Sequence, residues 1–269
     1  MNPVCYSSMA GHWTRGLSRH FGNQVKAITQ AFHGMDPPTI QSRLIMTSAP
    51  RRPFTIVVEG NIGSGKSTFL NEFQDLSNEL EIMPEPVDKW RNCHGTNLLQ
   101  RMYEDPKRWS MLFQTYVQLT MMQQHTKPCA KPTRIMERSL LSARYCFVEN
   151  LYAEGKLEDC EYAVLSEWFN YLLTCPSMNF KIDLIIYLRT RPDVAFQRIK
   201  DRDRSEECRI PFQYIQDLHD LHEDWLIRKT KFQPLQAPVI VIEANEDLDK
   251  LQAQYQRQKD EILQKSRTN

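Results

Sequence analysis

A phosphate-binding loop is the clearest chemical signal in the sequence. Residues 60–67, GNIGSGKS, match the motif G-x-x-x-x-G-K-[ST] in full. Glycine lets backbone N–H groups turn towards phosphate oxygens, Lys66 can reach the β- and γ-phosphates, and the Ser67 hydroxyl can ligate Mg²⁺. The motif therefore predicts that the chain binds ATP or a related nucleoside triphosphate. The residues assigned to this site are Gly60, Asn61, Ile62, Gly63, Ser64, Gly65, Lys66, Ser67 and Thr68.

Other segments of the chain help to distinguish between the classes of phosphate-loop protein. No N-K-x-D motif, with which GTPases recognise guanine, is present, and no strand of four apolar residues ends in Asp, as in typical motor ATPases. The carboxylate nearest to such a position is Glu137, in the segment RIMERS. Because the loop itself is shared by GTPases, motor ATPases and small-molecule kinases, these absences favour a small-molecule kinase.

Glu85 is a candidate general base. It follows a predicted strand, in the segment PEPV, and the carboxyl ends of parallel strands face the ligand crevice. A carboxylate in that place can accept the proton of an attacking hydroxyl group. An ordinary solvated glutamate would have the same sequence context, so the flanking prolines do not decide between the two.

A helix predicted over Trp109–Met122 carries one amide within an apolar stripe. Gln114 can donate and accept hydrogen bonds at once, as pairing with a pyrimidine edge requires. Phe113 and Trp90 could offer flat surfaces to a base. Core packing is the usual reason for such a stripe, and it remains the alternative. The stripe consists of Phe113, Gln114, Val117 and Met121.

Three arginines, Arg198, Arg202 and Arg204, cluster before Glu206 and Glu207. The first two are four residues apart and share one helix face. Converging guanidinium groups could stabilise the charge of a phosphoryl group in transfer. A solvated charged helix with Arg–Glu pairs is the alternative.

The elements that must position these residues alternate between strand and helix. Short β-branched runs predict strands, and longer segments with helical periodicity lie between them. Alternation of this kind predicts an α/β fold with a parallel sheet covered by helices on both faces. The strands are predicted at Phe54–Glu59, Glu81–Met83, Arg134–Glu137, Ile182–Leu188 and Val239–Ile242. The helices are predicted at Lys66–Ser77, Lys107–His125, Ser139–Ala153, Glu158–Leu173, Pro192–Asp201, Phe212–Thr230 and Asp247–Leu263.

Composition is that of an ordinary globular protein. The 269 residues carry a net charge of +1, and 41% are hydrophobic, so no strong field indicates nucleic acid or a membrane surface as a partner. No apolar run approaches the roughly 20 residues of a membrane span. The seven cysteines form no C-x-x-C pair, which favours free, buried thiols in a reducing compartment over a zinc or redox site.

The first 50 residues differ from the kinase-like remainder, 51–269. They contain no acidic residue before Asp36, and apolar residues recur at helical spacing among basic ones between Trp13 and Phe32. This pattern is typical of a mitochondrial transit segment. A disordered tail would look the same, and initiation at Met46 would leave a cytoplasmic or nuclear chain without the segment.

Together these segments resemble the deoxyribonucleoside kinase family, in particular its mitochondrial thymidine kinase and insect multisubstrate branch. The likeness runs from about Pro53 to Ala244. Its carriers are EGNIGSGKS from Glu59, EPVDKWRN from Glu85, QTYV from Gln114, MERS from Met136 with ARY from Ala143, LRT from Leu188 and LHEDWL from Leu221.

The resemblance implies a five-stranded phosphate-loop kinase with a lid, which transfers phosphate from ATP, with Mg²⁺, to the 5′-hydroxyl of deoxyribonucleosides in nucleotide salvage. Glu85 would be the base, Arg138 would hold Glu85 and the phosphoryl group, and Glu137 would lie near Mg²⁺ and be the rival base. Arg198, Arg202 and Arg204 would belong to the lid, and the loop near Asn245–Asp247, with Glu246 and Asp247, would contact adenine.

The resemblance also implies a nucleoside site and a dimer. Gln114 would bind the base, Phe147 would lie on one side of it with Trp90 and Phe113 on the other, and Tyr103 and Glu207 would hold the sugar 3′-hydroxyl. Relatives that prefer deoxycytidine or purines have Arg and Asp at the positions of Met121 and Ala143. The uncharged residues here favour thymidine and deoxycytidine, with weaker use of purines. A homodimer would form through helices near Ser139–Tyr152 and Glu158–Leu173.

Two other classes stay open at this stage. A nucleoside monophosphate kinase would need basic residues for a second phosphate where Glu85 lies. A non-catalytic nucleotide-binding subunit would be expected to lack at least one of Lys66, Glu85 and Arg138. The C-terminal segment Lys250–Asn269 is expected to be no more than an exposed helix or tail.

Overall fold

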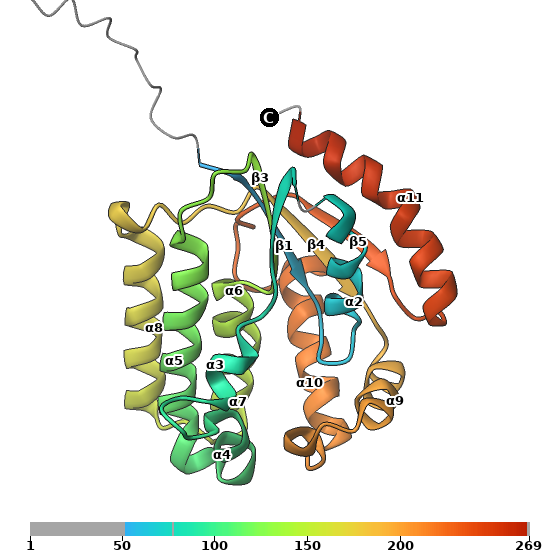
Figure 1. Cartoon of the computed structure of the whole chain (residues 1–269). Helices are drawn as coiled ribbons and strands as arrows, with labels where there is room; N and C mark the ends of the chain where they lie inside the picture. Colours follow the sequence, from blue (N-terminus) through green and yellow to red (C-terminus); the bar gives the residue numbers. More distant parts are fainter. Residues whose placement is uncertain (1–51, 77, 268–269) are drawn as a thin grey trace, which may run out of the picture. The chain divides into compact units, whose positions relative to one another are not determined.

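Five parallel strands form one sheet in the computed structural model, which describes residues 52–76 and 78–267 (Figure 1). The spatial order is β2-β3-β1-β4-β5. This confirms the predicted parallel sheet, and every predicted strand matches an observed one to within two residues. The strands are β1 (Phe54–Glu59), β2 (Leu80–Met83), β3 (Thr133–Glu137), β4 (Leu184–Arg189) and β5 (Val239–Glu243).

The register of the central strands brings the predicted catalytic segments together. Val58 of β1 pairs with Glu137 of β3, and Met83 of β2 pairs with Met136. The phosphate loop after β1, Glu85 after β2 and Arg138 after β3 therefore leave the sheet at one edge. This edge is the carboxyl end of the strands, where ligands of open α/β sheets bind.

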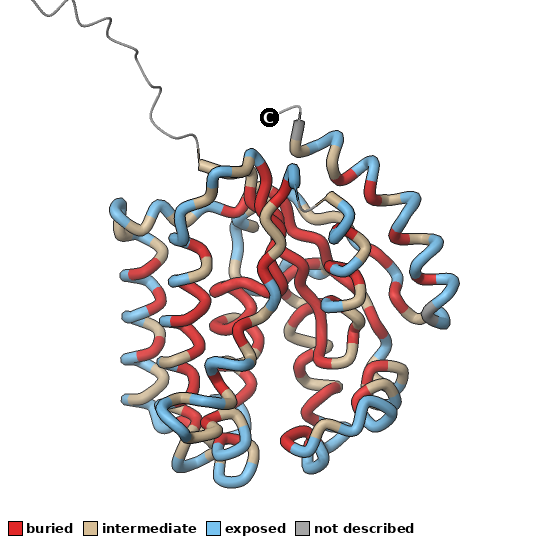
Figure 2. The backbone as a smooth tube through the Cα atoms, in the orientation of Figure 1, coloured by how far each residue is buried: buried red, intermediate tan, exposed pale blue. Residues whose placement is uncertain are grey.

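Each face of the sheet packs against its own group of helices. Alternate residues of β1 point to opposite faces, so that Val57 belongs to one hydrophobic core and Ile56 and Val58 belong to the other. The core around Val57 includes residues of α5 (Pro106–Thr126), α8 (Asp159–Thr174), α9 (Pro192–Arg202) and α10 (Phe212–His222). The core around Ile56 includes residues of α2 (Lys66–Asn71) and α11 (Leu248–Arg267). Figure 2 shows the buried strands between these helices.

The helical elements are those predicted, with two short additions. The structure adds α3 (Val87–Arg91) and α4 (Leu98–Glu104), which are too short to give a clear periodic signal. The other described α-helices are α2 (Lys66–Asn71), α5 (Pro106–Thr126), α6 (Leu140–Ser142), α7 (Glu149–Ala153), α8 (Asp159–Thr174), α9 (Pro192–Arg202), α10 (Phe212–His222) and α11 (Leu248–Arg267).

Three predicted helices differ from the observed elements. The helix expected over Lys66–Ser77 ends at Asn71, and a 3₁₀ turn follows because Phe73 bonds back to Leu70 as it packs its ring against Phe69. The helix expected over residues 139–153 contains a π-helical segment, η2 (Ala143–Val148). The helix expected to reach residue 230 becomes the π-helix η5 (Glu223–Ile227), and Lys229 then adopts a positive φ of 55°.

The C-terminal helix α11 is not merely an exposed helix or tail, as the sequence suggested. Leu251, Tyr255 and Ile262 are buried in the core around Ile56. Lys259 donates to the carbonyl oxygen of Glu72 at 2.7 Å. Spacings of three to four residues place these side chains on one helical face. The sequence alone did not show that this face packs against the rest of the protein.

Three further predictions concern the N-terminal extension, the cysteines and membrane-spanning helices. The N-terminal extension, residues 1–50, with its candidate transit segment, lies outside the described residues, as does Cys5. The six described cysteines are free, but only Cys146 is buried, so the expectation of buried thiols was wrong for the others. Among the residues that the structure describes, no helix is long and apolar enough to cross a bilayer.

Candidate active site

The phosphate loop connects β1 to α2 and is held by contacts with α9 and α10. Asn61 is buried, its amide donates to the Ile215 carbonyl oxygen of α10 at 2.8 Å, and its side-chain oxygen accepts from the Ile62 N–H. At Gly63, with φ of 76°, a Cβ atom would lie 2.4 Å from the Ala195 carbonyl oxygen. The glycine is therefore required by close packing on α9 as well as by backbone conformation.

Lys66 lies within the loop as a buried cation. Its ammonium group donates to the carbonyl oxygens of Asn61 at 2.7 Å and of Gly60 at 3.3 Å. Burial, and next the nearby Arg138 guanidinium, lower the pKa of Lys66 to about 7. An anion that enters the loop would relieve this desolvated charge, so the site is prepared for phosphate.

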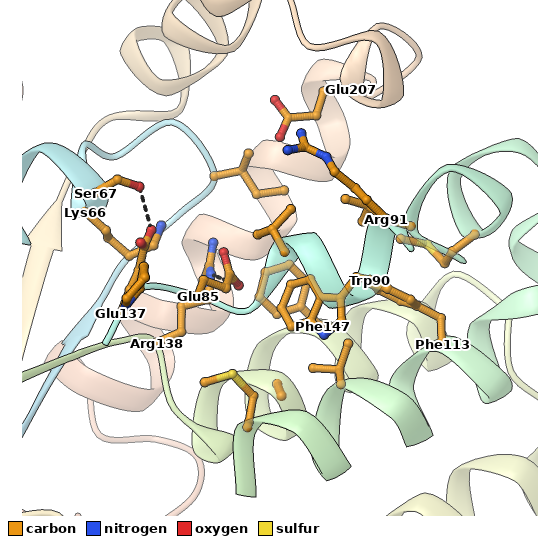
Figure 3. Close-up of a pocket in the computed structure, with 18 of the residues that line it drawn as sticks. Lys66, Ser67, Glu85, Trp90, Arg91, Phe113, Glu137, Arg138, Phe147 and Glu207 are labelled. Atoms are coloured by element: carbon orange, nitrogen blue, oxygen red, sulfur yellow. Dashed lines mark hydrogen bonds and ion pairs between the residues drawn. The ribbon is translucent and has the colours of Figure 1, made fainter. Parts of the chain in front are cut away.

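Ser67 and Glu137 meet at the start of α2. The Ser67 hydroxyl donates to Glu137 Oε1 at 2.9 Å, as Figure 3 shows. A hydroxyl and a carboxylate side by side are the oxygen ligands that Mg²⁺ takes beside nucleotide phosphates. The residues therefore fit the predicted metal site.

Glu85 and Arg138 form the second pair of the site. Arg138 Nε lies 3.0 Å from Glu85 Oε1, and Arg138 Nη1 donates to the Gly60 carbonyl oxygen at 2.9 Å (Figure 3). Burial raises the pKa of Glu85, although the Arg138 charge opposes this. Arg138 has a positive φ of 60°, a strained backbone state that persists only where its surroundings enforce it.

Glu59, for which the sequence suggested no role, interacts electrostatically with Arg138 of this pair. Its carboxylate is fully buried and accepts from the Ser139 hydroxyl at 2.5 Å. The same hydroxyl accepts from the Leu141 N–H and so caps α6. Burial raises the pKa of Glu59 to about 7, although Arg138 and Lys66 oppose this. The group offsets part of the buried positive charge of the site.

A cavity of about 310 Å³ extends from the phosphate loop to α5. Gln114 lines it, is buried and has no hydrogen-bond partner for its Oε1. An unpaired buried amide costs free energy until a ligand pairs with it. Gln114 therefore presents a polar group at the cavity wall, as the proposed base-binding role requires.

Aromatic side chains line the cavity around Gln114. Trp90 and Phe113 meet edge to face, with ring centroids 5.7 Å apart, and Trp90 is anchored by a 2.9 Å hydrogen bond to Thr120. Phe147 also lines the cavity, with its ring centroid 4.7 Å from Arg138 Cζ (Figure 3). The remaining predicted lining residues that the cavity contains are Tyr103, Val117, Met121 and Ala143.

Glu207 reaches the cavity from the turn that follows α9. Arg202 Nη2 donates to its carboxylate at 2.6 Å, and Arg204 Nη1 lies 3.5 Å away. The ring of Tyr103 lines the same cavity, and the charge of Glu207 contributes to raising the pKa of Tyr103, after the larger effect of burial. Both residues expected to hold the sugar hydroxyl therefore line one cavity.

The three lid arginines do not converge, contrary to the sequence-based expectation. Arg198 instead donates to the carbonyl oxygens of Ala244 and Glu246 at 2.9 and 2.8 Å. These carbonyl groups belong to the loop before α11, so Arg198 braces the predicted adenine loop, where Glu246 and Asp247 are exposed. Arg202 and Arg204 pair with Glu207 and line the cavity, so a role of these two arginines at the phosphoryl group stays a prediction.

Comparison with known proteins decides the family. A family model described as deoxynucleoside kinase matches residues 56–266. The chain belongs to the deoxynucleoside kinase family. Thymidine kinase 2, mitochondrial, of Homo sapiens is 50% identical over 208 residues, 77% of each chain. Deoxycytidine kinase 2 of Gallus gallus is 36% identical over 78% of this chain and 89% of its own. Deoxyguanosine kinase, mitochondrial, of Xenopus laevis is 37% identical over 71% and 82%.

The deoxynucleoside kinase site also contains residues that sequence reasoning missed. The short helices α3 and α4, neither of which was predicted, contribute five of these seven residues, and Pro84 and Ser139 lie in the connections after β2 and β3. A weak signal existed in Asn97, which caps α4 by accepting from the Gln100 N–H. The missed lining residues are Pro84, Val87, Asp88, Arg91, Leu99, Met102 and Ser139.

Proposed function

We propose that this deoxynucleoside kinase transfers the γ-phosphoryl group of ATP to the 5′-hydroxyl of thymidine and deoxycytidine. One observation carries the proposal. A single cavity is lined by the phosphate loop, by the Glu85–Arg138 pair, by aromatic and apolar side chains, and by Gln114, whose Oε1 has no hydrogen-bond partner. The relatives named thymidine kinase and deoxycytidine kinase support this choice of substrates.

Different residues of the site bind the base, accept the proton and hold the phosphate charge. Gln114 pairs with the base between the rings of Phe147 and Trp90. Glu85 accepts the proton of the 5′-hydroxyl, and Arg138 keeps the Glu85 carboxylate in place. Lys66 and the loop N–H groups hold the phosphates. Positioning and electrostatics supply most of the rate in phosphoryl transfer.

Ser67 and Glu137 are the residues that would hold Mg²⁺, which when bound neutralises charge on the β- and γ-phosphates. Their 2.9 Å contact is the support for this assignment. Both side chains lie beside Lys66 along the cavity wall. Mg²⁺ usually takes only one or two protein carboxylates and completes its shell with phosphate and water.

The reaction is tested by phosphorylation assays with thymidine, deoxycytidine, deoxyadenosine and deoxyguanosine at equal concentration, with ATP and Mg²⁺. We expect thymidine and deoxycytidine to give the highest kcat/KM. A purine nucleoside that matched or exceeded thymidine would contradict the proposed pocket. Absence of turnover with all four would contradict the reaction itself.

Met121 and Ala143 should control the choice between pyrimidines. Both are buried, line the cavity and leave apolar room for the thymine methyl group. We expect the double variant Met121→Arg/Ala143→Asp to lower kcat/KM for thymidine at least about 10-fold more than for deoxycytidine, because one apolar group discriminates by about 1–3 kcal/mol. Met102→Leu, a volume-conserving change in the same cavity, is the control. Equal losses for both nucleosides would contradict this assignment.

A homodimer is proposed through α5 and α8, of which α8 is the helix that the sequence suggested near Glu158–Leu173. We prefer α5 to the other suggested helix, near Ser139–Tyr152, because the segment 139–148 is largely buried within the protomer. Exposed apolar side chains instead follow one face of α8, at spacings of four and three residues, and recur on α5, which lies beside α8 (Figure 1). They are Val164, Trp168 and Tyr171 on α8 and Leu112 and Leu119 on α5.

Light scattering at micromolar concentration should give the mass of two chains. The double variant Val164→Asp/Trp168→Glu should give the mass of one, because two charges cannot be buried in an apolar interface without large cost. Glu167→Gln, a change between them, is the control. A monomeric wild-type protein would contradict the dimer.

We also propose that the protein is mitochondrial. The support is the basic, acid-free character of residues 1–35 and the word mitochondrial in the names of two relatives. A cytoplasmic or nuclear form that starts at Met46 remains the alternative.

A further inference from the structure

An ion pair joins the nucleoside helix α3 to the segment between α9 and α10. Arg91, at the end of α3, donates from Nε to Glu206 Oε1 at 2.6 Å, and its Nη2 lies 3.5 Å from Oε2. The two residues are 115 positions apart in the chain. We call residues 203–209 the lid segment. Figure 3 shows the Arg91 side chain extending towards this segment, which carries Glu207.

The pair is not an ordinary surface salt bridge, which contributes little. The Glu206 side chain is only 8% exposed and that of Arg91 is 34% exposed. Burial alone would raise the pKa of Glu206, but the hydrogen bond and charge of Arg91, together with hydrogen bonds from the Glu206 backbone and Asn97, outweigh burial and hold the pKa below its usual range. The carboxylate therefore keeps its charge and its partner across the neutral range.

Two neighbouring carboxylates of the lid segment face different partners. Glu206 and Glu207 belong to one 3₁₀ turn, Ser205–Glu207. Glu206 is held by α3, whereas Glu207 lines the nucleoside cavity and is bound by Arg202 and Arg204. Since a 3₁₀ turn leaves little freedom between adjacent residues, fixing Glu206 also fixes the position of Glu207.

We propose that the Arg91–Glu206 ion pair is a latch that holds the lid segment on α3 and positions Glu207 for the sugar 3′-hydroxyl. The inference rests on the proposed function, in which Glu207 contacts that hydroxyl. Arg91 lines the cavity but acts through Glu206, so it is a positioning residue. The latch joins the helix that carries Trp90, beside the base, to the turn that contacts the sugar.

The test compares thymidine with 3′-deoxythymidine, which retains the 5′-hydroxyl but lacks the 3′-hydroxyl. We expect Arg91→Met and Glu206→Gln each to raise KM for thymidine about 10-fold, with kcat changed less than about 3-fold. KM for 3′-deoxythymidine should change less than about 2-fold. The double variant should be no worse than either single one, because both remove the same interaction. The exchanged pair Arg91→Glu/Glu206→Arg should recover part of the loss.

Lys89→Met is the matched control, because Lys89 lies on the same helix but bonds Gln123 outside the lid. Equal losses with both nucleosides, or additive losses in the double variant, would overturn the latch. Wild-type protein that phosphorylates neither nucleoside would instead contradict the proposed function.

Limited proteolysis gives a second measurement that does not depend on turnover. Trypsin can cut after Arg204 and Arg209, within the lid segment. We expect Glu206→Gln, which keeps the shape of the side chain, to be cut there several times faster than wild type, with unchanged cleavage elsewhere. Unchanged cleavage in the lid segment would also overturn the proposal, and general acceleration across the chain would show misfolding and refute a local latch.

Discussion

Lys66→Met should lower kcat/KM for thymidine by about 10³-fold or more. The ammonium group is buried in the phosphate loop and is held by the Asn61 and Gly60 carbonyl oxygens. Among the described residues no other lysine lines the cavity, and Arg138 is already bound to Glu85 and the Gly60 carbonyl oxygen. Methionine retains the aliphatic stem and leaves less of a void than alanine would. Activity within 10-fold of wild type would contradict the assignment of the loop to ATP.

The same variant should be as stable as wild type or more stable at pH 7. Burial and Arg138 lower the pKa of Lys66 to about 7, whereas an unfolded lysine has a pKa near about 10.4. Between these values the unfolded chain binds more protons, so the Lys66 contribution to stability rises with pH. Methionine removes this dependence. Thermal unfolding at pH 7 and pH 9.5, with Lys107→Met as an exposed control, measures the difference.

Glu85→Gln should lower kcat by about 10²–10⁴-fold and leave thymidine binding nearly unchanged, because that is the usual size of a general-base contribution. The amide cannot accept the proton but still fills the space beside Arg138. Arg138 also keeps its 2.9 Å hydrogen bond to the Gly60 carbonyl oxygen. Steady-state kinetics and calorimetric titration with thymidine separate turnover from binding.

The pH profile distinguishes Glu85 from Glu137 as the base. Burial raises the pKa of Glu85, so kcat/KM of the wild type should fall as the pH drops through this raised pKa and the base becomes protonated. In Glu85→Gln this acidic limb should disappear. A near wild-type profile in Glu85→Gln, together with an inactive Glu137→Gln, would assign the base to Glu137.

Much of the fold could be predicted because its signals are local. The β-branched runs of β1 and β4 and the long periodic segments of α5 and α8 need no distant partner to be recognised. Helices α3 and α4, with five and seven residues, were missed. A helix of only one or two turns is stabilised mainly by the surface on which it packs, not by the helix propensity of its own residues. The burial of Tyr255 on α11 depends in the same way on contacts with α2.

The sequence by itself determined the chemistry of the site. The residue types and spacing of the phosphate loop, Glu85 and the Glu137-Arg138 pair follow from short contiguous motifs, and their positions at strand ends follow from the strand order of the chain. What only the tertiary structure decided is which groups pair. Arg198 turns to the loop before α11 and Arg91 reaches Glu206, because such contacts join residues far apart in sequence. Their partners are fixed by how the helices pack on the sheet, and no local pattern records that arrangement.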